Sequence, residues 1–426
     1  MNKKIAVAML SILAWIQAAQ SIEVINKENV TLNMHGRLQT FGLSDYVLDP
    51  YRDHLRIFLF VRQARLAFDG QVNTLKYDVE YAFGGEEGLK DTGGTVANSS
   101  LGLLDFAVDV PVRNDIYAKI GQFKVPYGLE RLQNSGDLLY TDRSIAHLPF
   151  NQGRDVGLAL YDSSQGFAWN FGLFTGGGRD NPIRNLPMRL GTPMFVFRGG
   201  YQSEAEENPF DPKQIDPDGL KPGFSVMTNL LFIRDTRVGH STVLRVKPVE
   251  KGLLTDSNWN PFIDTADGAS GSHTGDLFQG GGDLTWRTGM GSGLLTTEAE
   301  VNYGQYKNKI GWLEMTGART QLGYQQNQWG AGLRYGVIFA DNKFAKSGRV
   351  IFVNHRPVHE ITPSFTFFHK KFLKIVISAP VLVDVPVSTE TNLGMYVLTD
   401  QTDQTNAGPI IRQTVPSARA VVQFSF

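Results

Sequence analysis

The sequence predicts an all-β fold, a transmembrane antiparallel β-barrel of about 16 strands. Three observations carry this prediction. Strand-like runs alternate large apolar side chains with polar ones, the chain begins with a segment typical of an export signal, and no later segment has the apolar length of a membrane helix. Successive side chains of a strand point to opposite faces, so such runs have one apolar and one polar face. This pattern suits a wall with lipid outside and water inside.

The N-terminal segment is expected to be a signal peptide. Lys3 and Lys4 precede an apolar run over 5–16, and small residues follow it. A charged start, a short hydrophobic centre and small residues are typical of an export signal. The alternative, a membrane anchor, needs roughly 20 apolar residues, which this run does not reach. We therefore expect 1–21 to be removed and 22–426 to form a single barrel domain in the bacterial outer membrane.

The strands follow from the alternation. The run 75–83 alternates Leu, Tyr, Val, Tyr and Phe with Lys, Asp, Glu and Ala, and the runs 295–303 and 329–337 behave alike. The second face carries charges, amides and glycines, as a water-filled lumen would require. The number of expected strands is even, as in single-chain bacterial barrels. The strands are expected over 31–39, 55–68, 72–83, 102–110, 115–123, 155–161, 167–174, 193–202, 222–234, 275–287, 294–306, 310–325, 328–340, 356–368, 372–386 and 416–426.

The connections alternate in length, which indicates short periplasmic turns and long extracellular loops. Short connections are expected at 69–71, 111–114, 162–166, 326–327 and 369–371, and longer ones at 40–54, 84–101, 124–154, 175–192, 235–274, 341–355 and 387–415. Two connections break this alternation. The segment 203–221 is long where a short turn is due, and 307–309 is short where a loop is due.

Two strands carry more specific expectations. In 55–68 the apolar alternation changes parity partway, which a β-bulge near Gln63 would explain, because one extra residue resets the alternation. The bulge would turn both Arg62 and Arg65 towards the lumen. In the last strand, apolar residues at every second position end in Phe426, while Arg419 lies on the opposite face.

Composition excludes several other functions. The 426 residues include no cysteine, which removes disulfides, thiolate chemistry and cysteine metal sites. The net charge is −1, or −3 without Lys3 and Lys4, so nucleic-acid binding has no support. Neither the histidines nor the loop aspartates at 211, 216 and 218 have the spacing of a metal site, and a solvated turn is the favoured interpretation of those aspartates. We expect no metal, no cofactor and no catalytic residues.

Several runs resemble one known family. The runs VRQARLAFDG at 61–70 and KIGQFKVPYGLE at 119–130 resemble segments of the phosphate-selective porins O and P. The runs at 329–335 and 422–426 are similar but less specific. The resemblance implies a homotrimer of sixteen-stranded barrels, each with an inward-folded third loop and with arginines lining the pore for anions such as phosphate. This chain departs from that pattern, since its mature part is slightly acidic.

Selectivity in such a channel depends on charges at the narrowest point. The loop 124–154 is the expected constriction, and its candidate side chains are Lys124, Arg131 and Arg143. The candidates on the wall, chosen by their face, are Arg37, Arg62, Arg65, Lys119, Arg319, Arg334 and Arg419. For each arginine the alternative is a wall residue paired with a lumen carboxylate. We expect passive diffusion of small hydrophilic solutes. The alternatives are a structural or adhesive surface barrel and an outer-membrane enzyme built on a barrel.

Overall fold

The computed structural model describes most of the expected strands and part of the connections. The described residues are 22–47, 54–85, 102–113, 115–176, 193–204, 208–216, 218–237, 274–307, 311–346, 349–352, 357–369, 371–388, 395–396 and 410–426. The predicted signal peptide and most of the long loops lie outside these residues, so the signal peptide stays a prediction.

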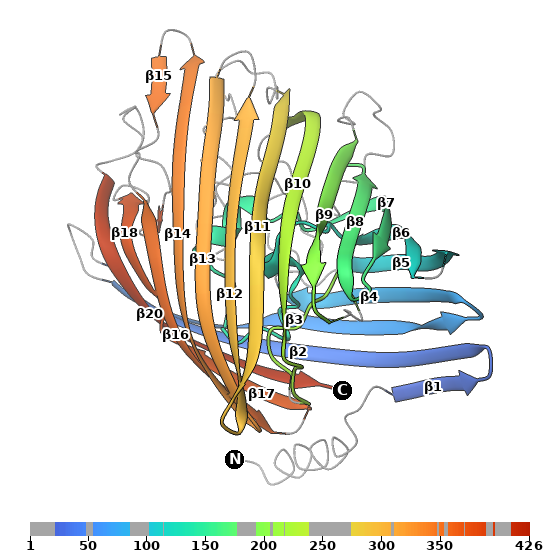
Figure 1. Ribbon diagram of the computed structural model, residues 1–426. Helices are drawn as coiled ribbons and strands as arrows, with labels where there is room; N and C mark the ends of the chain where they lie inside the picture. Colours follow the sequence, from blue (N-terminus) through green and yellow to red (C-terminus); the bar gives the residue numbers. More distant parts are fainter. Residues whose placement is uncertain are drawn as a thin grey trace.

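The described strands form one closed antiparallel barrel of 16 wall strands (Figure 1). The wall consists of β2 (Val30–Val47), β3 (His54–Val72), β4 (Leu75–Gly85), β5 (Gly102–Arg113), β6 (Ile116–Lys124), β7 (Arg154–Asp162), β8 (Gly166–Phe174), β9 (Met194–Gln202), β10 (Gly223–Arg237), β11 (Thr274–Met290), β12 (Gly293–Lys307), β13 (Gly311–Gln326), β14 (Trp329–Lys346), β16 (Val358–His369), β17 (Leu373–Ser378) with β18 (Val381–Ser388), and β20 (Ile410–Ser425). Each strand pairs with the next, and β20 closes the ring on β2. Each of the 16 expected ranges overlaps one of these wall strands. The bounds differ, because β2 extends to Val47 and β14 to Lys346, into the loops expected at 40–54 and 341–355.

The remaining strands are short additions to the wall. β1 (Ile22–Lys27) pairs with the start of β2, β15 (Arg349–Phe352) forms a hairpin with β14, and β19 (Met395–Tyr396) pairs with β18. β17 and β18 act as one wall strand, interrupted where Pro380 has no N–H to donate to the ladder. Two backbone hydrogen bonds bridge the interruption, from Ala379 N to Pro363 O and from Ser417 N to Pro380 O.

The two faces of the wall differ as the alternation predicts. On β14, Leu333 and Tyr335 point outwards and are 52% and 40% exposed, whereas Arg334 between them points into the lumen and is 3% exposed. Similar exposed apolar residues occur on the outer face around the barrel. Such a surface would be unfavourable in water and suits lipid.

The bulge in β3 is confirmed. Gln39 of β2 pairs with Gln63 and the next residue, Thr40, pairs with Val61, so Arg62 is the extra residue. The extra residue leaves Arg62 and Arg65 both on the buried, lumen-facing side.

The C-terminus helps to close the barrel. Phe426 and Gly36 of β2 exchange two backbone hydrogen bonds of 2.9 and 3.0 Å. On β20, Arg419 and Gln423 face the lumen as the alternation predicts. The short helices α2 (Leu129–Leu132) and η2 (Ile145–Phe150) lie between β6 and β7. No helix in the described part of the chain is long and apolar enough to span a membrane.

Candidate pore constriction

The connection between β6 and β7, residues 125–153, contacts the lumen face of the wall at many points. Asn134 accepts a 2.7 Å hydrogen bond from Arg37 of β2. The Lys374 ammonium of β17 donates to the carbonyl oxygens of Gly136 and Leu138, at 2.9 and 2.5 Å. These strands are far from β6 along the wall, so the β6–β7 connection is fastened to distant parts of the barrel.

Lumen-facing glycines make room for this connection on β13 and β14. A Cβ placed on Gly317 would lie 2.3 Å from the carbonyl oxygen of Ala146 and 2.9 Å from the ring of Phe150. A Cβ on Gly332 would lie 2.6 Å from the side chain of Leu139. The interpretation of the β14 glycines as part of a wet lumen surface is therefore wrong, because the connection packs against them.

Arg319 of β13 lies at the centre of a carboxylate cluster. Its guanidinium is 3.1 Å from Glu298 and 3.1 Å from Glu300, both on β12, and 3.4 Å from Glu130 of α2. The Arg319 side chain is 1% exposed. Burial of several charges is tolerated here because each has an opposite charge beside it.

Arg334 of β14 contacts both the β6–β7 connection and the neighbouring strand β16. It contacts Glu360 of β16 at 2.6 Å and Glu130 at 3.4 Å, and it donates to the carbonyl oxygen of Asp142 at 2.9 Å. Its guanidinium also lies 4.5 Å from the centroid of the Tyr140 ring. Glu130 thus links the β6–β7 connection to two wall arginines.

The bulge in β3 positions a second group of contacts. Arg62 contacts Asp142 at 2.7 Å and donates to the carbonyl oxygen of Thr141. Arg65 contacts Glu80 of β4 at 2.9 Å, and Arg154 contacts the same carboxylate at 2.8 Å. Without the bulge, one of the two β3 arginines would face lipid.

The other candidates are distributed along the lumen. Lys119 contacts Asp109 at 3.0 Å, and Lys124 contacts Asp211 at 2.8 Å. Arg143 donates to the carbonyl oxygens of Glu130 and Gln133, at 2.8 and 2.6 Å. Arg131 is half-buried in α2, and Arg419 is buried on the lumen face of β20.

The lumen-facing basic side chains form two groups according to their partners. Arg37, Arg62, Arg65, Lys119, Lys124, Arg319 and Arg334 each contact a carboxylate, as the wall-residue alternative describes, and Arg37 does so at 3.8 Å from Glu80. Arg143 and Lys374, by contrast, are held by carbonyl oxygens, so these hydrogen bonds leave their charge in place. Lys374 was not among the sequence candidates, although its position in an alternating strand would have placed it in the lumen.

Two carboxylates of this region are more exposed than their partners. The Asp142 side chain is 31% exposed against 9% for Arg62. The Asp211 side chain is 28% exposed against 10% for Lys124. Water at these two pairs therefore contacts the negative partner more than the positive one.

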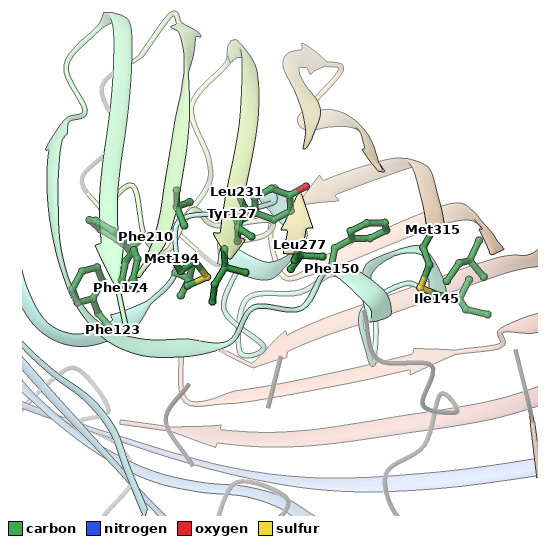
Figure 2. Packing of buried hydrophobic residues seen from close by; sticks show 14 of the residues in the cluster. Phe123, Tyr127, Ile145, Phe150, Phe174, Met194, Phe210, Leu231, Leu277 and Met315 are labelled. Atoms are coloured by element: carbon green, nitrogen blue, oxygen red, sulfur yellow. The ribbon is translucent and has the colours of Figure 1, made fainter. Parts of the chain in front are cut away.

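An apolar layer also lines part of the lumen. Leu231, Leu277 and Met315 lie on the lumen faces of β10, β11 and β13 and are at most 1% exposed. They belong to one cluster with Tyr127 and Phe150 of the β6–β7 connection (Figure 2). This apolar layer could not be predicted from the sequence, because an apolar residue on the expected polar face looks like an irregularity in the alternation.

The neighbouring arginines lower the pKa of two carboxyl groups of the β6–β7 connection. Burial alone raises the pKa of Glu130, but Arg319 and Arg334 outweigh it, and the pKa lies below its usual range. Burial likewise raises the pKa of Asp142, and the neighbouring Arg62 outweighs it, again with a net lowering. Both groups therefore remain ionised at neutral pH.

The stability of the barrel should decrease in acid. A carboxyl group with a lowered pKa stabilises the folded state above its ordinary pKa, and this contribution is lost as the pH falls through the folded-state value. We expect the urea midpoint in detergent to change little between pH 7 and 5 and to fall below about pH 4, the ordinary carboxyl range. Tryptophan fluorescence would follow the transition. The variant Glu130→Gln should show a smaller decrease, and a midpoint that rose in acid would contradict this account.

The sequence and fold of this chain are similar to those of known proteins. The model of a family described as phosphate-selective porin O and P matches residues 32–201. The chain is an outer-membrane porin. The match contains the runs at 61–70 and 119–130 that carried the resemblance, and also the whole β6–β7 connection. The porin is a channel protein and not an enzyme.

Solved structures confirm the fold of the porin. OmpT of Vibrio cholerae is 9% identical with a TM-score of 0.53, over 95% of this chain and 100% of that one. An anion-selective porin from Comamonas acidovorans is 12% identical with a TM-score of 0.53, over 93% and 100%. The outer membrane channel DcaP of Acinetobacter baumannii is 11% identical with a TM-score of 0.51, over 95% and 99%. No curated protein matches the porin in sequence.

The aspartates of the β9–β10 connection differ from the sequence interpretation. The sequence favours a solvated turn for all three, but Asp211 contacts Lys124 and Asn134 in the lumen. Asp218 is exposed, as a solvated turn requires. Within the described residues, no group of three or more His, Asp or Glu side chains could hold a metal ion.

Proposed function

We propose that the porin is a weakly selective diffusion channel for small hydrophilic solutes, inorganic anions among them. Selectivity depends on the charges that remain at the narrowest point after pairing. We place this point at the β6–β7 connection, the inward-folded third loop that the family resemblance implies. The observation that carries the proposal is the pairing of seven of the candidate cations with carboxylates.

Arg143 and Lys374 provide the positive charge in this proposal. Their side chains donate hydrogen bonds to carbonyl oxygens, and Arg143 and the neighbouring Asp142 are both half-buried. The guanidinium of Arg143 and the ammonium of Lys374 attract anions, whereas the carboxylate of Asp142 attracts cations. The two effects oppose each other, which supports weak rather than strong selectivity and argues against a filter specific for phosphate.

A homotrimer is part of the proposal. Its support is the family resemblance together with a trimer form described for OmpT of Vibrio cholerae. Cross-linking in detergent followed by mass measurement would test this.

Reversal potentials across a KCl gradient test the selectivity. We expect a small reversal potential for the wild-type porin. The double variant Arg131→Gln with Arg143→Gln removes two positive charges and should shift the permeability ratio towards cations. One unit charge a few ångströms away in water changes the ratio by roughly two- to fivefold, so the double variant should shift it by at least that much. Lys371→Gln is the control, because that lysine is exposed on the turn before β17. A large anion-selective potential abolished in the double variant would instead indicate a phosphate-type filter.

A further inference from the structure

The connection between β9 and β10 enters the lumen although it lies at the end of the barrel where short turns are due. The structure describes it at 203–204, 208–216 and 218–222. Phe210, Gln214 and Ile215 are 4%, 5% and 2% exposed, which is unlike a turn in solvent. Most of this connection is therefore packed against other parts of the porin.

Two apolar side chains anchor the connection. The Phe210 ring packs edge-on against Phe123 of β6 and Tyr161 of β7, with centroids 5.3 and 5.2 Å apart (Figure 2 shows Phe210 beside Phe123). Ile215 packs in a cluster with Leu139 of the β6–β7 connection. A Cβ on Gly330 of β14 would lie 2.8 Å from Ile215, so the wall is shaped to receive it.

Polar contacts join the two connections directly. The carbonyl oxygen of Asp137 accepts a 3.1 Å hydrogen bond from Ile215 N. The side-chain oxygen of Gln214 accepts a 2.6 Å hydrogen bond from Leu139 N. Asp211 accepts from Asn134 at 3.0 Å. The β6–β7 connection therefore does not stand alone in the lumen.

Asp211 is a charged group of this junction that water reaches, with a side chain 28% exposed. It lies 2.8 Å from Lys124, whose side chain is much less exposed than its own. Lys124 also donates to the carbonyl oxygen of Leu132 at 2.8 Å, which holds its ammonium in place without Asp211. Removing the Asp211 charge would therefore leave an ammonium fixed at the same position.

The junction also contains a small cavity. Its volume is about 10 Å³, close to the room that one water molecule needs. Leu139, Gln214 and Ile215 line it together with Gln321 of β13. Within the described part of the chain, the buried side-chain oxygen of Gln321 has no hydrogen-bond partner. A water molecule in this cavity would satisfy the Gln321 oxygen.

We propose that the β9–β10 connection is the second half of the constriction and that Asp211 is a selectivity-determining residue. Asp211 neutralises Lys124 and presents its own negative charge to permeating ions. This inference rests on the proposed diffusion function, because it assigns selectivity within the same bore.

The variant Asp211→Asn tests the inference in planar bilayers. Asparagine keeps one of the two acceptor oxygens of Asp211, so one of the bonds from Lys124 and Asn134 is retained. The carbonyl oxygen of Leu132 still holds Lys124, so the junction should stay intact while the charge is lost. We expect the anion-to-cation permeability ratio to rise by roughly two- to fivefold. The matched control is Asp218→Asn, which removes the same charge from a 59% exposed side chain of the same connection and should leave the ratio unchanged.

A second variant tests the position of the connection in the bore. Replacing 209–218 with a Gly-Ser-Gly linker should increase the single-channel conductance, because polypeptide leaves the lumen. The inference about Asp211 would be wrong if the wild-type porin conducts but neither variant changes it. That is, Asp211→Asn would keep the wild-type permeability ratio, and the linker variant would keep the wild-type conductance. The proposed channel function would stand in that case. A folded wild-type porin that does not conduct would overturn the proposed function as well.

Discussion

Replacing Gly317 with valine is expected to detach the β6–β7 connection from β13 and to increase the single-channel conductance. A Cβ at Gly317 would lie 2.3 Å from the carbonyl oxygen of Ala146, and a backbone atom cannot move away as the end of a side chain can. Overpacking of this kind typically costs about 1–3 kcal/mol, and displacement of the short helix η2 would relieve it. Single-channel recordings would show the larger conductance, and urea unfolding in detergent would show the loss of stability.

Gly289→Val is the matched control for this variant. Gly289 lies on β11 in another barrel strand, and a Cβ there would meet nothing within 4 Å. We expect the Gly289 variant to conduct as the wild type does. Equal conductance and equal stability in the two valine variants would show that the β6–β7 connection does not depend on Gly317.

Replacing Arg319 with alanine should be the most destabilising of the proposed substitutions. The change would leave Glu130, Glu298 and Glu300 without the guanidinium that lies between them. Breaking a buried charge pair by removing one partner typically costs about 3–5 kcal/mol, because the remaining charge is desolvated and uncompensated. Urea unfolding in detergent, followed by tryptophan fluorescence, would measure the change in the free energy of unfolding.

Lys371→Ala is the comparison for Arg319→Ala. The Lys371 side chain is 47% exposed and pairs with the exposed Asp218. Exposed ion pairs contribute about 0–1 kcal/mol, so this variant should unfold almost as the wild type does. A cost for Arg319→Ala no greater than that of Lys371→Ala would mean that the three carboxylates are hydrated rather than held by the arginine.

The wall of the barrel could be predicted from the sequence because each strand carries its own signal. Lipid on one side and polar lumen on the other impose a period of two, and even the bulge at Arg62 appears as a change of parity. The face of each candidate arginine follows from the same period. The resemblance at 119–130 also directed attention to the connection that follows β6.

The filling of the lumen could not be predicted in the same way. The contact of Leu139 with Gly332 joins segments far apart in the sequence, and neither residue has a pattern that names its partner. From the sequence alone, Gly332 could face water in the lumen or contact another segment of the chain. Only the tertiary structure distinguishes these two environments. The length of 203–221 was an available signal for the second connection, but its Pro- and Asp-rich sequence is also typical of a turn in water.

Current through single molecules tests the central claim most directly. Purified porin with 22–426 intact would be added to a planar bilayer in symmetric KCl, after circular dichroism has confirmed its strand content. A closed barrel with a polar bore predicts discrete, reproducible conductance steps of one sign at each voltage. Folded protein that inserts into the bilayer and gives no steps would contradict the account.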